Sequence, residues 1–178
     1  MHKQDFTRIA LAVCCTFALA AHAQGTHRST TGLSAADAKF VHEAAMGGME
    51  EVELGKLAQQ NASNDDVKKF GSRMVDDHSK ANDKLKSVAG SKGVALPTSL
   101  DSKAQGDVNK LAKSKNFDRD YMDMMVKDHK KDVADFQKQA KSGKDSDVKE
   151  FAASTLPTLQ EHLKMAQDTD KTVKMAKK

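Results

Sequence analysis

Four long stretches of the chain carry apolar residues at intervals of three and four positions, with charged residues between them. This spacing places the apolar side chains on one face of an α-helix, because a helix completes a turn about every 3.6 residues. The stretches cover approximately 34–61, 63–90, 116–142 and 146–172, and a shorter amphipathic stretch covers 100–112. The pattern predicts four long helices, with a short crossover helix between the second and the third.

Polar residues mark where these helices start. Ser34 precedes Asp37 by three residues and Ser63 precedes Asp66 in the same way, which is typical of a helix N-cap. Asn116 is predicted to cap the third long helix. These three caps define the predicted starts of the first three long helices.

Glycine and proline mark where the helices end or bend. The second long helix is predicted to run to Gly90 and Gly93, and Gly143 is predicted to end the third in the left-handed conformation that glycine adopts easily. Ser146 opens the last long helix. Pro157 lies inside it, where we expect a kink because proline lacks an N–H group.

The first 23 residues have the layout of a secretory signal peptide. Lys3 and Arg8 form a basic start, an apolar run covers 9–21, and Ala21 and Ala23 are the small residues before the predicted cleavage site. The apolar run is shorter than the roughly 20 residues that a membrane span needs. We therefore predict a mature chain without a transmembrane anchor, secreted across the inner membrane into the periplasm.

The remaining chain is predicted to form one domain. Residues 1–23 are the signal peptide, 24–34 a disordered polar arm, 35–172 the four-helix bundle and 173–178 a basic tail. Only 4% of the residues are aromatic and the chain has no Trp, which is too few aromatic residues for a typical β-sandwich. The predicted fold class is all-α.

Composition and charge exclude several kinds of chemistry. Cys14 and Cys15 both lie in the predicted signal peptide, so the mature chain has no thiol for a disulfide or a metal. The net charge is +4 with both signs interspersed, unlike the basic stripe with stacking aromatics that binds nucleic acid. The sequence also has no haem-attachment motif, no phosphate-binding glycine loop and no nucleophile elbow, so we expect no haem and no nucleotide. The partner and the oligomeric state stay open.

One ionisable residue interrupts the apolar face of each long helix: Glu51, His78, His129 and His162. Each lies near the middle of its predicted helix. The midpoints of antiparallel neighbours in a bundle meet at one level. We therefore predict that the four side chains converge in one central layer.

Such a layer is unfavourable unless its members satisfy one another, because an unpartnered buried carboxylate costs several kcal/mol. Neutral imidazole nitrogens and a carboxylate oxygen are suitable ligands for Zn, Cu, Fe or Ni. One interpretation is a site for a single transition-metal ion. The other is a closed hydrogen-bonded cluster in which an ionised Glu51 faces a protonated histidine.

Several residues near this layer have other interpretations. Asp77, Asp128 and Glu161 directly precede the three histidines, and successive helical residues diverge by about 100°, so these carboxylates are predicted to point to the flanks as solvated groups or interhelix partners. Tyr121 is interpreted as an ordinary aromatic near the bundle end, with a hydrogen bond to the site as the alternative.

A second group of candidate ligands, a histidine, two methionines and a glutamate, follows helical spacing on the opposite side of the first long helix. Thioether and imidazole ligands together would suit copper. We favour packing of the methionines beneath the crossover helix, because methionine fills irregular gaps. The group consists of His42, Met46, Met49 and Glu53.

Four segments resemble a known family. They are residues 51–58 (EVELGKLA), residues 74–78 (MVDDH), Phe117-Asp118-x-x-Tyr121 with His129, and residues 156–163 (LPxLxxHL). As a set they resemble the bacterial domain of unknown function 4142 family, and the resemblance covers 40–166. It implies a secreted protein with a ferritin-like up-down four-helix bundle and a long crossover between the second and third long helices. It implies no settled activity, because the family has none.

A two-iron site of the ferritin type is not expected. Such sites use a Glu-x-x-His pair on each of two helices and a further Glu on each of the others. Here the residues three positions before the histidines are Val75, Val126 and Leu159. A single-ion site or a metal-free polar layer is better supported.

The sequence thus favours a periplasmic bundle that binds one transition-metal ion through Glu51, His78, His129 and His162. A metal-binding or stress-response role is favoured over turnover, and whether the protein is an enzyme stays undecided. The alternative is a metal-free structural or protein-interaction module whose buried polar layer fixes the helix register. A small metal-dependent oxidase ranks lower, because the core has few carboxylates.

Overall fold

The computed structural model describes residues 32–176, so the predicted signal peptide and most of the predicted polar arm lie outside the described residues. The described chain is helical and contains no strand, which confirms the all-α prediction. The helices are α1 (Ala35–Asn61), α2 (Asp65–Ser91), α3 (Ser102–Ala112), α4 (Phe117–Ser142) and α5 (Ser146–Met175).

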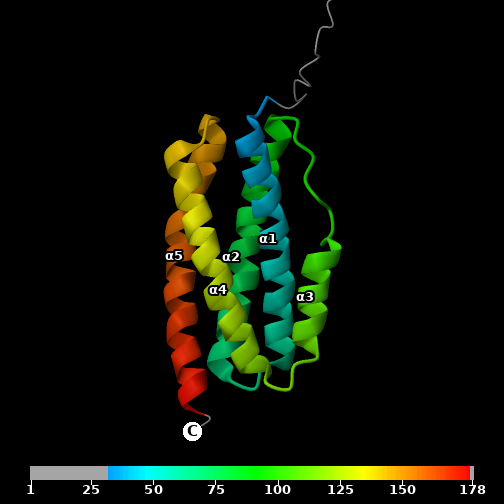
Figure 1. Cartoon of the computed structure of the whole chain (residues 1–178), viewed down its shortest axis with the longest axis vertical. Helices are drawn as coiled ribbons and strands as arrows, with labels where there is room; N and C mark the ends of the chain where they lie inside the picture. Colours follow the sequence, from blue (N-terminus) through cyan, green and yellow to red (C-terminus); the bar gives the residue numbers. More distant parts are fainter. Residues whose placement is uncertain (1–31, 177–178) are drawn as a thin grey trace, which may run out of the picture.

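Four of the helices form an antiparallel bundle in which α1 and α5 run in one direction and α2 and α4 run in the other (Figure 1). Helix α1 packs along α2, α4 packs along α5, and the two pairs meet where α2 contacts α5 and α1 contacts α4. A long connection leads from the end of α2 to α3, which lies outside the bundle against α1. The predicted crossover is therefore confirmed. Because neighbouring helices are antiparallel, residues near the middle of each helix lie at one level.

No helix within residues 32–176 is long and apolar enough to cross a membrane.

The starts of α1 and α2 agree with the prediction to within one residue. Ser34 caps α1, and its Oγ accepts a hydrogen bond of 3.1 Å from the Asp37 N–H. The prediction that Ser63 caps α2 is wrong by one position, because the Asn64 side chain accepts the bond from the Asp66 N–H at 2.8 Å.

The end of α4 differs from the prediction. Gly143 has φ −57° and is not left-handed; of the residues described, Gly93 alone has a positive φ. The loop is held extended because the N–H groups of Lys144 and Asp145 donate hydrogen bonds to Asp37. Glycine is needed for space instead, since a Cβ at Gly143 would lie 2.4 Å from Gln139 Nε2.

Helix α5 is longer than predicted. The helix is not interrupted at Pro157, and it continues to Met175. Val173 is buried against the core, so the first residues of the predicted basic tail 173–178 belong to the bundle.

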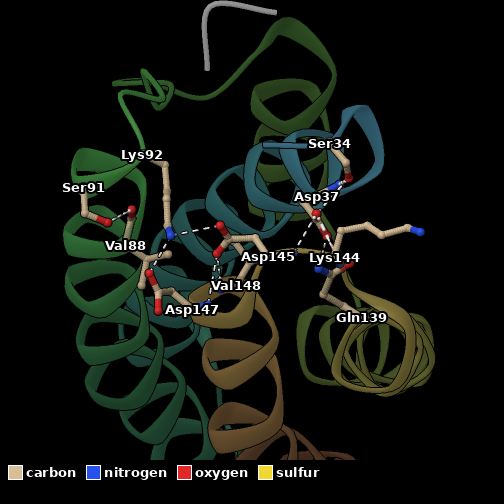
Figure 2. Close-up of polar contacts among 10 residues, drawn as sticks. All are labelled: Ser34, Asp37, Val88, Ser91, Lys92, Gln139, Lys144, Asp145, Asp147 and Val148. Carbon is tan, nitrogen blue, oxygen red and sulfur yellow. Dashed lines mark hydrogen bonds and ion pairs between the residues drawn. The ribbon is translucent and has the colours of Figure 1, made fainter. Parts of the chain in front are cut away.

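Asp37 connects three helices at one end of the bundle (Figure 2). Its carboxylate accepts hydrogen bonds from Ser34 Oγ at 2.7 Å, from Gln139 Nε2 at 2.7 Å and from the backbone N–H groups of Lys144 and Asp145. Burial alone would raise the pKa of Asp37, but these hydrogen bonds lower it, so the carboxylate stays ionised. The start of α1 is thereby fixed against the α4–α5 loop.

Ion pairs and a second aspartate complete the connections between helix ends. Lys92 Nζ, just after α2, lies 2.9 Å from Asp145 Oδ2 and 2.6 Å from Asp147 Oδ2 at the start of α5 (Figure 2). At the opposite end of the bundle, the Asp118 carboxylate of α4 accepts bonds from the N–H groups of Ser63 and Asn64 in the α1–α2 loop. At each end of the bundle, therefore, an aspartate side chain accepts hydrogen bonds from backbone N–H groups of a neighbouring loop.

The hydrophobic core consists of two separate clusters. One cluster contains Leu54, Val67, Phe70, Met74, Tyr121, Met125 and Val173 among others. The other contains Val41, Leu85, Phe136, Val148, Phe151 and Leu159 among others. Along each of the four bundle helices, one predicted polar residue falls between the part that enters the first cluster and the part that enters the second. The polar layer therefore divides the core.

Helices α1 and α2 approach closely at two glycines. A Cβ at Gly55 would lie 2.7 Å from the carbonyl oxygen of Gly71 and 2.9 Å from Val75 Cγ2, whereas a Cβ at Gly47 would meet nothing within 4 Å. A backbone carbonyl cannot move aside as a flexible side chain can. The contact at Gly55 therefore sets the separation of α1 and α2 just beyond the polar layer.

These two positions give a matched test within α1. Gly55→Ala is expected to destabilise the protein by about 1 to 3 kcal/mol through overpacking, even though alanine is the better helix former. Gly47→Ala is expected to stabilise it by about 0.5 to 1 kcal/mol. Urea unfolding followed by circular dichroism measures both free energies. If Gly55→Ala were as stable as the wild type, the close approach of the two helices would be wrong.

Candidate metal centre

The four predicted site residues lie on the four bundle helices and are all buried. Glu51 is on α1, His78 on α2, His129 on α4 and His162 on α5, and none exposes more than 6% of its surface. They occupy the boundary between the two halves of the core. All four lie at one level of the bundle, near the middle of each helix, as predicted.

The three histidines converge. The ring centroids are 5.7 Å apart between His78 and His129, and 5.4 Å apart for each of the other two pairs. Each histidine offers one nitrogen, and the three nitrogens all lie within 4.8 Å of one another. The imidazoles of three helices therefore form a nearly equilateral group, which we call the histidine cluster.

The hydrogen bonds of the cluster fix which nitrogens are available. His129 Nδ1 lies 3.0 Å from the carbonyl oxygen of Met125, so it carries the proton and donates to that oxygen. His162 Nε2 lies 2.9 Å from Asp77 Oδ2 and donates to it. The opposite ring nitrogens, His129 Nε2 and His162 Nδ1, are buried without a hydrogen-bond partner, as is His78 Nε2. Each histidine thus has one buried ring nitrogen without a hydrogen-bond partner among the described residues, and in His129 and His162 this nitrogen carries the lone pair.

Glu51 lies beside the cluster and not among its converging atoms. Its Oε1 is 3.7 Å from His129 Nδ1, the nitrogen that already donates to Met125. Its Oε2 is buried without a hydrogen-bond partner. In the described chain the group of possible metal ligands contains the three histidines alone. The structure therefore brings three of the four predicted residues together and places the fourth behind one of them.

Burial determines the charge of these groups. It lowers the pKa of His78 to about 3 and that of His129 to about 4, and it lowers the pKa of His162 against the opposing effect of Asp77. Burial and the nearby carboxylates raise the pKa of Glu51 well above its usual range. At neutral pH His129 is therefore uncharged, which argues against the interpretation in which an ionised Glu51 faces a protonated histidine.

Asp77 is a hydrogen-bond partner of His162, although the sequence analysis interpreted it only as a flanking group. Hydrogen bonds from Arg73 and His162 outweigh the effect of burial and lower the pKa of Asp77, which is therefore ionised. Arg73 also contacts Asp77 from one turn earlier on α2. An ionised carboxylate on α2 thus orients the imidazole of α5, as the interhelix alternative anticipated.

The remaining residues of interest fall on different sides of the bundle. Tyr121 is fully buried, and its hydroxyl has no hydrogen-bond partner among the described residues. Met49 lines hollows beside the α2–α3 connection, in line with the packing interpretation. His42 and Met46 instead line a pocket on the side where α1 meets α4.

A group of acidic residues in that pocket was not predicted as a group. Glu50 on α1 and Asp128 and Asp132 on α4 lie close enough to repel one another. Burial first, and this repulsion second, raise the pKa of Glu50; burial and neighbouring carboxylates raise the pKa of Asp132 to about 7. The spacing of Asp128 and Asp132 on one helical face was visible in the sequence, but its proximity to Glu50 depends on which helices are neighbours.

These features define a class: a four-helix bundle whose core is divided by a cluster of three buried histidines. The sequence matches the family described as "Domain of unknown function (DUF4142)" over residues 22–169, and the chain belongs to that family. The resemblance noted in the sequence is thereby confirmed. No curated protein matches the chain.

Solved structures share the fold. The "DUF305 fragment from Deinococcus radiodurans" aligns with a TM-score of 0.68 at 11% identity, over 79% of this chain and 98% of that one. CopM aligns in its Cu(I)-bound form with a TM-score of 0.65 and in its Cu(II)-bound form with 0.66, each at 15% identity over 76% of this chain and 96% of that one. At these identities the likeness shows the fold alone.

The lowered histidine pKa values predict how the metal-free protein responds to acid. An unfolded histidine takes up a proton below pH 6.5, whereas folded His129 stays neutral until about pH 4, so its contribution to stability is complete above pH 6.5 and is lost as the pH falls. In chelator, we expect the wild type to lose about 2 kcal/mol more than His129→Leu between pH 7 and pH 5.

Denaturant unfolding at both pH values measures this difference. Met122→Leu, a core substitution on the same helix that removes no titrating group, should lose stability in parallel with the wild type. A wild type and a His129→Leu variant with equal losses would contradict a neutral buried His129.

Proposed function

We propose that this protein binds one transition-metal ion through His78, His129 and His162. Two observations carry the proposal: each of the three histidines offers a nitrogen within 4.8 Å of the other two, and each has a buried ring nitrogen with no hydrogen-bond partner in the described chain. Buried polar groups are nearly always satisfied, and leaving one unmet costs about 1 to 3 kcal/mol. A metal ion would satisfy all three at once.

The geometry is close to what ligation requires. At metal–nitrogen distances of about 2.0 to 2.1 Å, neighbouring ligand nitrogens lie roughly 3.3 to 3.5 Å apart. The nitrogens of the histidine cluster lie within 4.8 Å of one another, so small rotations of the rings would close the site. Because burial keeps the imidazoles neutral, protons do not compete for the lone pairs near neutral pH.

The surroundings of the cluster support ligation as well. Ligating histidines usually donate their other N–H group to a carbonyl or a carboxylate, which fixes the ring and its tautomer. His129 does so to Met125 and His162 does so to Asp77. Two of the three rings are thereby held through one nitrogen, which leaves the other nitrogen of each ring for the ion.

Copper in its monovalent state is the ion we propose first. Imidazole ligands suit Zn, Cu, Fe and Ni, but three neutral ligands in an apolar core add no charge to offset that of the ion. The cost of burying an ion rises steeply with its charge, so a monovalent ion is favoured. The fold likeness to CopM, which has been solved with Cu(I) and with Cu(II) bound, makes copper a reasonable first choice for an experiment.

The cellular setting of the proposal comes from the sequence. Residues 1–23 are predicted to direct the chain across the inner membrane, so we place the metal-binding or stress-response role in the periplasm. The alternative is a metal-free layer that fixes the helix register, and the experiments below distinguish it from a metal site.

Metal binding is tested with the mature chain, from Gln24 onward. Anaerobic titration with Cu(I) against a coloured competing chelator, and separately with Zn(II), should show one ion per chain. Free metal at 100 times the dissociation constant should stabilise the fold by about 2.7 kcal/mol, measured as a rise in melting temperature. His129→Leu should abolish both effects, whereas Met122→Leu should keep them. If no metal stabilises the wild type, the layer is a metal-free structural feature.

Asp77 provides a test of the orienting contact. Asp77→Asn should weaken metal binding about 10- to 100-fold, because the amide no longer offers an ionised acceptor to His162. Asp76→Asn makes the same change of charge at the exposed neighbouring position and should leave the affinity within about twofold of the wild type. Equal affinities for the two variants would show that Asp77 does not position His162 for the metal.

A further inference from the structure

A pocket of about 410 Å³ opens on the side of the bundle where α1, α4 and the start of α3 meet. Carboxylates predominate in its lining. Glu50 and Glu51 contribute from α1, Asp128 and Asp132 from α4, and Asp101 from the residue that caps α3. The pocket thus has a strongly acidic lining next to the histidine cluster.

The two lysines that line the pocket offset the negative charge of this lining only in part. Lys103 attracts Glu50 and Asp128, and Lys131 attracts Asp132. Their ion pairs are formed with other residues, however: Lys103 Nζ pairs with Asp107 at 2.8 Å and Lys131 Nζ pairs with Asp135 at 2.8 Å. Neither of these aspartates lines the pocket. In the described part of the chain, Glu50, Asp128 and Asp132 form no ion pair with a basic side chain. A cation would supply the missing charge.

Glu51 provides an independent sign of a ligand. It lines the pocket although it exposes only 3% of its surface, and its Oε2 has no hydrogen-bond partner. A buried oxygen of this kind needs a donor or a cation. Its other oxygen lies 3.7 Å from His129 Nδ1, so this one side chain borders both the pocket and the histidine cluster.

The pocket lies next to a small cavity that reaches the histidine cluster. Gly47 lines both the pocket and this cavity of about 40 Å³, which His78 also lines. A Cβ at Gly47 would meet nothing within 4 Å. Asp132 borders both as well.

We propose that this acidic pocket is a second cation site, which binds a hydrated transition-metal ion through Glu50, Glu51, Asp128 and Asp132. The carboxylates do not form a group with oxygens all within 4.8 Å of one another in the described chain. The ion is therefore held largely through its water shell, and more weakly than an ion bound directly. His42 and Met46 at the rim add an imidazole and a thioether. The pocket also has an entry role, which rests on the proposed function: ions collected there supply the histidine cluster.

The cation site is tested without the histidine cluster. In the His129→Leu variant, Mn²⁺ should broaden the backbone amide signals of residues around the pocket on α1 and α4 in ¹⁵N-resolved NMR spectra. The added pair Glu50→Gln and Asp132→Asn should remove this broadening, whereas Asp76→Asn with Glu150→Gln, an equal change of charge at exposed carboxylates elsewhere, should leave it. Broadening that is spread over all acidic surfaces, or that persists without Glu50 and Asp132, would overturn the site.

The entry role is tested by kinetics on the mature wild-type sequence. Co²⁺ loading of the histidine cluster, followed by its visible absorption, should slow at least tenfold in Glu50→Gln with Asp132→Asn at low ionic strength, while the matched control pair loads at the wild-type rate. Equal rates in all three proteins would overturn the entry role. If Co²⁺ does not bind the histidines at all, the proposed function and the entry role both fail. The Mn²⁺ measurement would still show whether the acidic pocket binds a cation.

Discussion

The structure depends on one costly feature, three imidazole nitrogens buried in an apolar core with no hydrogen-bond partner among residues 32–176. Each unmet group opposes folding, and the rings could gain partners if the helices moved apart and admitted water. The rest of the bundle prevents that. Asp37 fixes one end, Asp118 fixes the other, and the glycine contact at Gly55 sets how near α1 and α2 can lie. The two halves of the core then enclose the layer from above and below.

Burial of the three imidazoles lowers the stability of the protein in acid but favours the binding of a metal ion. It keeps the imidazoles neutral, which costs stability in acid because the unfolded chain accepts protons that the folded chain does not. The same neutrality leaves the lone pairs ready for a metal ion. A layer meant only to fix the helix register would be more stable if its members bonded to one another. Here His129 bonds to a carbonyl and His162 to Asp77, and the other nitrogen of each ring is buried with no partner among the described residues.

Helical periodicity was sufficient to predict the bundle and the level of the polar layer, because both depend on spacing within a helix. The rings of His78 and His162 reach the same centre, with centroids 5.4 Å apart. Contacts between helices could not be predicted this way. Asp77 was assigned to the flank of α2, and in the bundle that flank faces α5. The bond between the Asp145 N–H and Asp37 spans 108 positions, so no local pattern could have indicated it; it also explains why Gly143 is not left-handed.

The two sides of the histidine cluster are chemically different, and this difference gives the site a direction. On the α2–α5 side, Asp77 is ionised and paired with both Arg73 and His162, so that side is fixed. On the α1–α4 side the carboxylates lack basic partners. Of the three rings, His129 and His162 are each held by a hydrogen bond, whereas His78 has none in the described chain and lines the small cavity. His78 is therefore the ring that hydrogen bonds restrain least. Closing the three nitrogens around an ion would need rotations of the rings, and the hydrogen bonds of His129 and His162 would restrict the rotations of those two most.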